Sequence, residues 1–246
     1  MKKKILALCL VVALVAVAAI GGSLAYFTDT DAKNNVFTTG NVDIKLDENF
    51  GDNDPSTPEK LTPATGSAQD GTLKNGVTKE VTVENIGSED AYIRVHIAIP
   101  SILDNGDPDF DAGKNTLHFN YSKDSIGAGK WDWNKTYDGT SFDGDWNYYT
   151  TTIDGIDYNV YVVTYLTALK KGQTTPEKAI YQVYLDSNTS QEAIAKYKEV
   201  LGENWQIKVL AEGTQAAGFD DAYTALNTSF GVPGTYQLDW SKAVDQ

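Results

Sequence analysis

The sequence has very few residues that crosslink chains or bind metals. In 246 residues it contains one cysteine, Cys9, and two histidines, His96 and His118. Cys9 lies in a segment that we expect to be removed, so no disulfide can hold the mature domain, which must rely on its core, on backbone pairing or on self-association. A catalytic zinc ion needs about three protein ligands and an open position. The two histidines lie on different segments with no H-E-x-x-H spacing, so no zinc site is predicted.

Signatures of other catalytic classes are also missing. The chain has no G-x-S-x-G pattern, and its 34 acidic residues make carboxylate pairs common by chance. We therefore predict that the protein is not an enzyme and needs no cofactor. His96 falls on the polar face of a predicted strand and His118 falls among loop residues. We expect both to be solvated or hydrogen-bonded.

Basic residues are scarce relative to acidic ones. The chain has 20 lysines and arginines against 34 acids, a formal net charge of −14. Without three lysines of the N-terminal segment, 17 basic residues remain and the mature chain carries −17. Such a surface repels phosphate backbones and anionic lipids, so nucleic-acid and membrane-surface partners are not predicted. Solubility and cation binding are the expected consequences.

There is one long apolar run, at residues 5–20. Three lysines precede it and the small residues 21–23 follow it, which is the order of a secretory signal peptide. We predict cleavage between Ala25 and Tyr26, because Ser23 and Ala25 suit the small-residue positions of a cleavage site. The alternative is an uncleaved anchor, but sixteen residues fall short of the roughly 20 needed to span a bilayer. The protein is therefore expected to be secreted or held at the cell surface.

Alternating apolar residues predict an all-β protein. In the clearest strand, residues 91–99, one face carries Ala91, Ile93, Val95, Ile97 and Ile99, and the other Tyr92, Arg94, His96 and Ala98. Further strands are expected at 42–46, 78–83, 147–153, 156–169, 179–185 and 205–211. Asp154-Gly155 and Lys171-Gly172 are predicted turns. The pattern favours a β-sandwich, with a jelly roll as first choice.

Two short helices complete the predicted domain at residues 26–231. Thr189 and Glu192 form a capping-box pattern for a helix that Gly202 ends, and a shorter helix is expected at residues 221–227. Residues 101–155 are rich in acidic residues, glycine and aromatic residues, and we interpret them as an insertion. We expect the tail, residues 232–246, to be loosely held.

The insertion carries two candidate binding sites. Alternating acids suggest a weak calcium site, although the match to an EF-hand loop fails at Ala112 and His118. A solvated acidic loop is the alternative. The calcium candidates are Asp104, Asp107, Asp109 and Asp111. Aromatic residues could form a sugar-stacking platform or, alternatively, a small core of the insertion itself. They are Trp131, Trp133, Trp146, Tyr148 and Tyr149.

Three blocks of sequence resemble the TasA/camelysin family, in the family's order. They are AYFTD at 25–29 with FTTGNVDI at 37–44, VTVENIGS at 81–88 with AYIRV at 91–95, and IKVLAE at 207–212 with QAAGFD at 215–220. The resemblance implies a secreted subunit of a biofilm-matrix fibre that is processed by a SipW-type signal peptidase. Its expected partners are further copies of itself, a fibre-seeding subunit and matrix polysaccharide.

The resemblance also implies assembly by donor-strand exchange. The donor would begin with Tyr26, Phe27, Thr28, Asp29 and Thr30, in a stretch to residue 35 without proline or glycine. Main-chain pairing would supply affinity and side-chain pockets the register. Alternatively, the same stretch pairs within its own subunit. Two other functions stay open. One is a polysaccharide-binding module, and the other is a metallopeptidase, the activity assigned to camelysin-like relatives.

Overall fold

The computed structural model describes eight stretches of the chain: residues 28–30, 41–49, 61–65, 74–104, 116–120, 131–132, 148–202 and 205–243. The predicted signal peptide, its cleavage site at Ala25 and Tyr26, and Phe27 lie outside these stretches. Among the described residues, no helix is long and apolar enough to cross a membrane.

The larger sheet has six antiparallel strands. Its order is β1-β11-β5-β9-β7, and β8 pairs with β9 along the same edge as β7. The strands are β1 (Thr28–Thr30), β5 (Ala91–Pro100), β7 (Trp131–Asp132), β8 (Tyr148–Ile153), β9 (Ile156–Leu169) and β11 (Lys208–Gln215). β5 lies in the middle, paired over its length with β11 on one side and β9 on the other.

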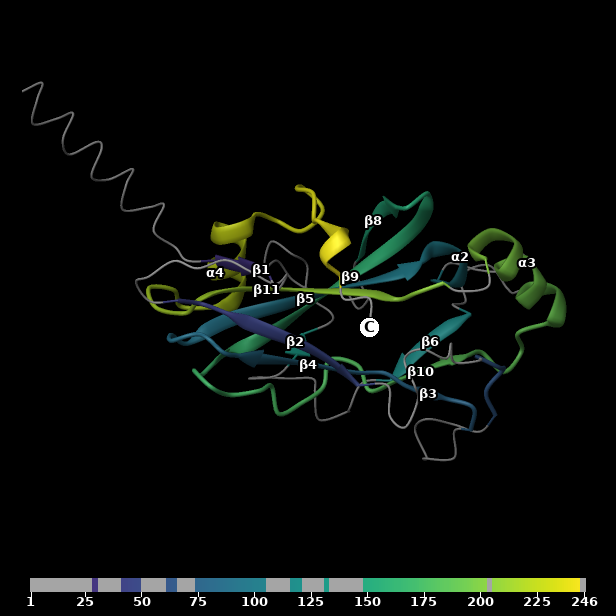
Figure 1. Ribbon diagram of the computed structural model, residues 1–246, viewed down its shortest axis with the longest axis horizontal. Helices are drawn as coiled ribbons and strands as arrows, with labels where there is room; N and C mark the ends of the chain where they lie inside the picture. The colour runs from purple at the N-terminus through teal and green to yellow at the C-terminus, as the bar shows by residue number, and fades with distance from the viewer. Residues whose placement is uncertain are drawn as a thin grey trace, which may run out of the picture.

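A second layer faces this sheet (Figure 1). It contains the pair β2-β4 and the three-stranded sheet β3-β10-β6. The strands are β2 (Ile44–Asn49), β3 (Val77–Thr78), β4 (Glu80–Asn85), β6 (Leu117–Asn120) and β10 (Gln182–Leu185). Residues 179–181 pair with β4, with Val81 N donating to Ile180 O at 3.0 Å. The predicted strand 179–185 is therefore split, because its first residues pair with β4 and its last with β6.

The main core lies between the two layers. Ile93, Val95 and Ile97 of β5 are fully buried there, together with Ile44 and Val83 of the second layer. The layers pack closely beside β11, where a Cβ added to Gly213 would come within 2.9 Å of Ile44 Cγ2. An all-β sandwich is thus the observed fold, and the jelly-roll connectivity stays a prediction.

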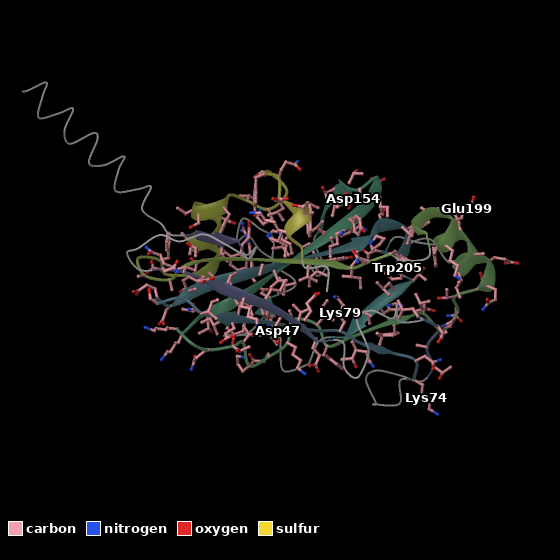
Figure 2. The ribbon with its side chains drawn as sticks, in the orientation of Figure 1. Asp47, Lys74, Lys79, Asp154, Glu199 and Trp205 are labelled. Carbon is pink, nitrogen blue, oxygen red and sulfur yellow. The ribbon has the colours of Figure 1, made fainter. Side chains whose placement is uncertain are left out.

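The β8–β9 hairpin has the predicted turn. Asp154 (φ 54°) and Gly155 (φ 82°) both adopt positive φ, as a two-residue type I′ turn requires. Figure 2 shows Asp154 at the tip of this hairpin. The turn at Lys171-Gly172 also forms, with Gly172 at φ 72°.

Within the described stretches, three helices and one 3-10 turn join the strands: α2 (Ser101–Asp104), α3 (Gln191–Leu201), α4 (Ala222–Phe230) and η2 (Trp240–Lys242). The capping residue of α3 is Ser190, whose Oγ accepts from Ala193 N at 3.0 Å. The prediction of Thr189 was wrong by one position, since Thr189 donates instead to Asp186 O. Gly202 ends α3 as expected.

Candidate functional site

The N-terminal strand β1 lies at the edge of the six-stranded sheet. It pairs antiparallel with β11 of its own chain, with Thr28 opposite Thr214, Asp29 opposite Gly213 and Thr30 opposite Glu212. Figure 1 shows β1 beside β11 and close to α4. Within one chain, three residues of the predicted donor thus occupy the position that the same-subunit alternative describes, and exchange between copies stays a prediction.

A buried charged cluster lies on the β11 residues that receive β1. Glu212 Oε2 accepts from Arg94 Nε at 2.6 Å, and both carboxylate oxygens accept from Tyr236 OH, at 2.8 and 2.7 Å. The His96 ring adds Nε2 at 2.9 Å from Glu212 Oε2. Glu212 and Arg94 are only 1% and 2% exposed. We name these four residues, Arg94, His96, Glu212 and Tyr236, the Glu212 cluster.

Arg94 also holds the end of α4. Its Nη1 donates to Asn227 Oδ1 at 2.9 Å, and its Nη2 donates to Gly231 O at 3.1 Å and to Tyr236 OH at 2.7 Å. The guanidinium also lies over the Phe230 ring, 5.6 Å from its centroid, a cation–π geometry. All three guanidinium nitrogens are therefore engaged with oxygen acceptors.

The charges of the cluster follow from burial and pairing. Burial alone would raise the pKa of Glu212, but hydrogen bonding from His96, the charge of Arg94 and the hydrogen bond from Tyr236 lower it to about 2. Burial lowers the pKa of His96, against the opposing effect of Glu212. At neutral pH the cluster therefore holds one carboxylate, one guanidinium and a neutral imidazole. The imidazole donates from Nε2 to Glu212 and accepts at Nδ1 from Tyr149 OH at 3.3 Å.

This geometry corrects part of the prediction for His96. The hydrogen bonds are present, but the ring is 0% exposed and so is not solvated. His118 is partly exposed, with Nε2 2.9 Å from Asp186 Oδ2 and its ring stacked on Tyr184. The two histidines belong to different sheets, His96 to β5 and His118 to β6.

Asp104 is a core residue. Its Oδ2 accepts from Asn159 Nδ2 at 2.9 Å and from Tyr161 OH at 2.7 Å, while Oδ1 is buried with no hydrogen-bond partner among the described residues. Burial raises its pKa to about 6, against the two hydrogen bonds. Asp104 is therefore not part of a solvated loop. The other calcium candidates, Asp107, Asp109 and Asp111, lie outside the described residues.

Trp131 does not belong to a surface platform. Its side chain is 0% exposed, its Nε1 donates to Glu177 O at 2.8 Å, and its ring packs edge-on against Tyr165. It belongs to the main core rather than to a separate core of the insertion. Tyr148 is half-buried against Tyr161, and Tyr149 contacts His96. Trp133 and Trp146 lie outside the described residues.

Sequence reasoning missed the roles of Glu212 and Tyr236. Glu212 directly follows Ala211, the last residue of the strand predicted at 205–211, and an acid there looks solvent-facing. The one available signal was Arg94 and His96 on the same face of a central strand, because a buried cation requires an anionic partner.

The family model described as camelysin metallo-endopeptidase matches residues 1–92. No curated protein and no solved structure matches the chain. The family's description implies a catalytic metal, which the described residues do not fit. Among them no three His, Cys, Asp or Glu side chains could jointly hold a metal ion, and the two histidines lie in separate sheets.

The match covers part of the sequence blocks described above. The matched range contains the first block, at residues 25–44, and most of the second, at 81–95, which ends inside the central strand β5, whereas the third block, at 207–220, lies outside it. The chain is thus similar to the camelysin family over residues 1–92 of its 246 residues.

Proposed function

We propose that the protein is a secreted structural subunit of an extracellular matrix fibre, assembled by exchange of its N-terminal strand. The observation that supports this is the place of β1: an edge strand with three register pairs, which starts two residues after the predicted mature N-terminus. While the leader is attached, Tyr26 is tied to an apolar segment. Cleavage by a SipW-type peptidase would free the strand and so control assembly.

Exchange is energetically accessible because it replaces the strand with an identical one. A three-residue strand makes few backbone hydrogen bonds, and each contributes about 1 kcal/mol net. The strand is therefore held weakly in its own chain. The same bonds form when β1 of a second copy takes its place, and the association entropy is the main added cost. A donor at one edge and an acceptor at another site form a heterologous contact, which produces filaments when it does not close.

The charge of the mature chain should make the assembly depend on cations. At −17, neighbouring copies repel, and salt screens exposed charges over about 10 Å at 0.1 M. We therefore expect polymer to increase with ionic strength and with divalent cations. Matrix polysaccharide and a seeding subunit are further proposed partners.

We also propose that the chain is not a peptidase, despite the description of the family model that matches residues 1–92. This proposal is supported by the small number of potential zinc ligands. The chain has two histidines, and each is already hydrogen-bonded to an acidic residue. Purified protein should contain no stoichiometric zinc. Casein cleavage that disappears on His96→Ala or His118→Ala would overturn this.

Deletion of residues 26–35 from the mature chain tests the fibre proposal. The full mature chain should sediment as polymer and form filaments under the electron microscope, and the deleted chain should remain monomeric. A synthetic peptide of residues 26–35 should bind the deleted chain and not the intact monomer. Undiminished polymer from the deleted chain would contradict the donor-strand mechanism.

A further inference from the structure

The C-terminal part of the chain covers the face of the six-stranded sheet that points away from the second layer (Figure 1). We call residues 221–243 the C-terminal clamp. It contains α4, then a segment with Tyr236, then η2, and it packs on Tyr92 through Ala222, Ala225 and Leu226. Trp240 contacts a second apolar group around Ala98, Tyr158 and Val160. The tail, residues 232–246, which was expected to be loosely held, thus contributes Trp240 to this second group and Tyr236 to the Glu212 cluster.

Polar anchors tie the clamp to particular strands. Tyr236 OH bonds Glu212 of β11, and Ser229 Oγ lies 2.7 Å from Thr214 Oγ1 of the same strand. A separate anchor joins Tyr223 OH to Asp132 Oδ2 of β7, at 2.9 Å. The clamp is therefore anchored at β11, on the β1 side of the sheet, and at β7, on the other side of β5.

The anchors on β11 coincide with the binding site of β1. Glu212 and Thr214 are the residues opposite Thr30 and Thr28. Between them, Gly213 is opposite Asp29 and lies against Ile44 of the second layer. All three β11 residues that receive β1 are thus held by contacts in which β1 takes no part.

We propose that the clamp, through Tyr236 on Glu212 and Ser229 on Thr214, keeps β11 in place as an open sheet edge while β1 is exchanged. This inference rests on the proposed function and names the residues that position its acceptor strand. When β1 leaves, β11 loses one of its two neighbouring strands. Without Tyr236, the Glu212 carboxylate would also lose the hydroxyl that donates to both of its oxygens. Glu212 would then lie beside a sheet edge that water can reach. The strand would then be free to move away from the register that the incoming donor needs.

Two tyrosines of the clamp provide a matched comparison. Both Tyr236 and Tyr223 donate to a carboxylate, and in both burial raises the pKa above its ordinary value. They differ in the strand that they hold, β11 for Tyr236 and β7 for Tyr223. Removal of either hydroxyl should lower the stability of the fold to a similar degree. Only the loss of the Tyr236 hydroxyl should weaken the binding of an incoming β1 to the acceptor strand β11.

The experiment compares the mature chain with Tyr236→Phe and Tyr223→Phe. The critical concentration for polymer is measured by sedimentation and the melting temperature by calorimetry. We expect Tyr236→Phe to raise the critical concentration about tenfold, the effect of one hydrogen bond to a charged group. Tyr223→Phe should lower the melting temperature similarly and leave the critical concentration within about twofold. If Tyr236→Phe proves too unstable to purify, Ser229→Ala replaces it, with an expected increase of about threefold.

Two results would overturn the inference: equal critical concentrations for all chains, or changes in both variants that simply follow the melting temperature. The proposed function fails separately. If the chain without residues 26–35 still polymerises, donor exchange is wrong. If that deletion abolishes polymer while Tyr236→Phe assembles like the parent chain, only the role of the clamp is wrong.

Discussion

The two faces of β5 are both buried, but by different means. The inner face packs Ile93, Val95 and Ile97 into an apolar core, whereas the outer face carries Tyr92, Arg94 and His96 beneath the C-terminal clamp. Alternation in the sequence identified the two faces correctly and suggested that the polar one meets water. It does not, because a distant segment covers it. Alternation therefore tells which residues share a face and not what lies over that face.

Two buried carboxyl groups, Glu212 and Asp104, show the same difference between the outer and inner sides of the sheet. On the outer face, Glu212 receives hydrogen bonds at both oxygens and its pKa falls to about 2. On the inner side, Asp104 has one satisfied oxygen and its pKa rises to about 6. Burial favours the neutral acid in both places, and the number of donors and the nearby Arg94 decide the outcome. The outer cluster is thus built to hold a charge, and the inner site is not.

The largest effect is expected from removing the cation of the outer face. Arg94→Ala would leave Glu212 buried without its charged partner, which typically costs about 3–5 kcal/mol of unfolding free energy. Denaturant unfolding measures it. The matched control is Lys178→Ala, which breaks an ion pair with Glu80 whose side chains are 39% and 24% exposed and should cost less than about 1 kcal/mol. Equal losses in the two variants would mean that the outer cluster does not stabilise the fold as described.

The next largest effect is expected from low pH, which should reduce the contribution of Glu212 to the free energy of unfolding. The folded-state pKa of Glu212 lies below its ordinary value of 4.5, so its contribution is complete above pH 4.5 and is lost as pH falls toward 2. The shift corresponds to about 3 kcal/mol. Comparison with Glu212→Gln isolates it: the stability advantage of the parent chain should shrink by that amount between pH 6 and pH 2. A constant difference over this range would show that the pKa of Glu212 is not lowered.

The inner carboxyl should respond with the opposite sign. Because the folded-state pKa of Asp104 lies above its ordinary value of 3.8, the folded chain binds the proton more tightly, and stability falls as pH rises through 3.8 to about 6. Relative to Asp104→Asn, the parent chain should lose about 2–3 kcal/mol between pH 4 and pH 7. The same unfolding series detects this, and a loss in the same direction as at Glu212 would contradict it.

The smallest effect should come from Gly213, which lies on the inner side of β11. Gly213→Ala places a Cβ 2.9 Å from Ile44 Cγ2, and overpacking of this kind costs about 1–3 kcal/mol. Gly76→Ala is the matched control, since its close neighbour is the side-chain end of Gln182, which can move aside. Thermal unfolding of both should show the larger loss at Gly213.

Local patterns allowed part of this fold to be predicted. The hairpin at Asp154-Gly155, the end of α3 at Gly202 and the strand β5 each depend on residues within a few positions of one another. The Glu212 cluster does not, since Arg94 is 118 residues from Glu212 and 142 from Tyr236. The tail after Gly231 has no periodicity, so nothing local indicated that Tyr236 would lie on a buried carboxylate. Trp131 likewise resembled its aromatic neighbours in the insertion, although it alone among the described ones is fully buried.

A disulfide between copies would test donor exchange most directly. Residues 26–246, the predicted mature chain, contain no cysteine, and Thr28 lies opposite Thr214, at a spacing that a cross-strand disulfide can bridge. Thr28→Cys and Thr214→Cys are made in separate chains, mixed during assembly, oxidised and separated without reductant. Exchange predicts a mixed dimer joined through these two positions. If the mixture gives no such dimer, while a single chain with both substitutions closes its own disulfide, β1 stays in its own subunit and the fibre proposal fails.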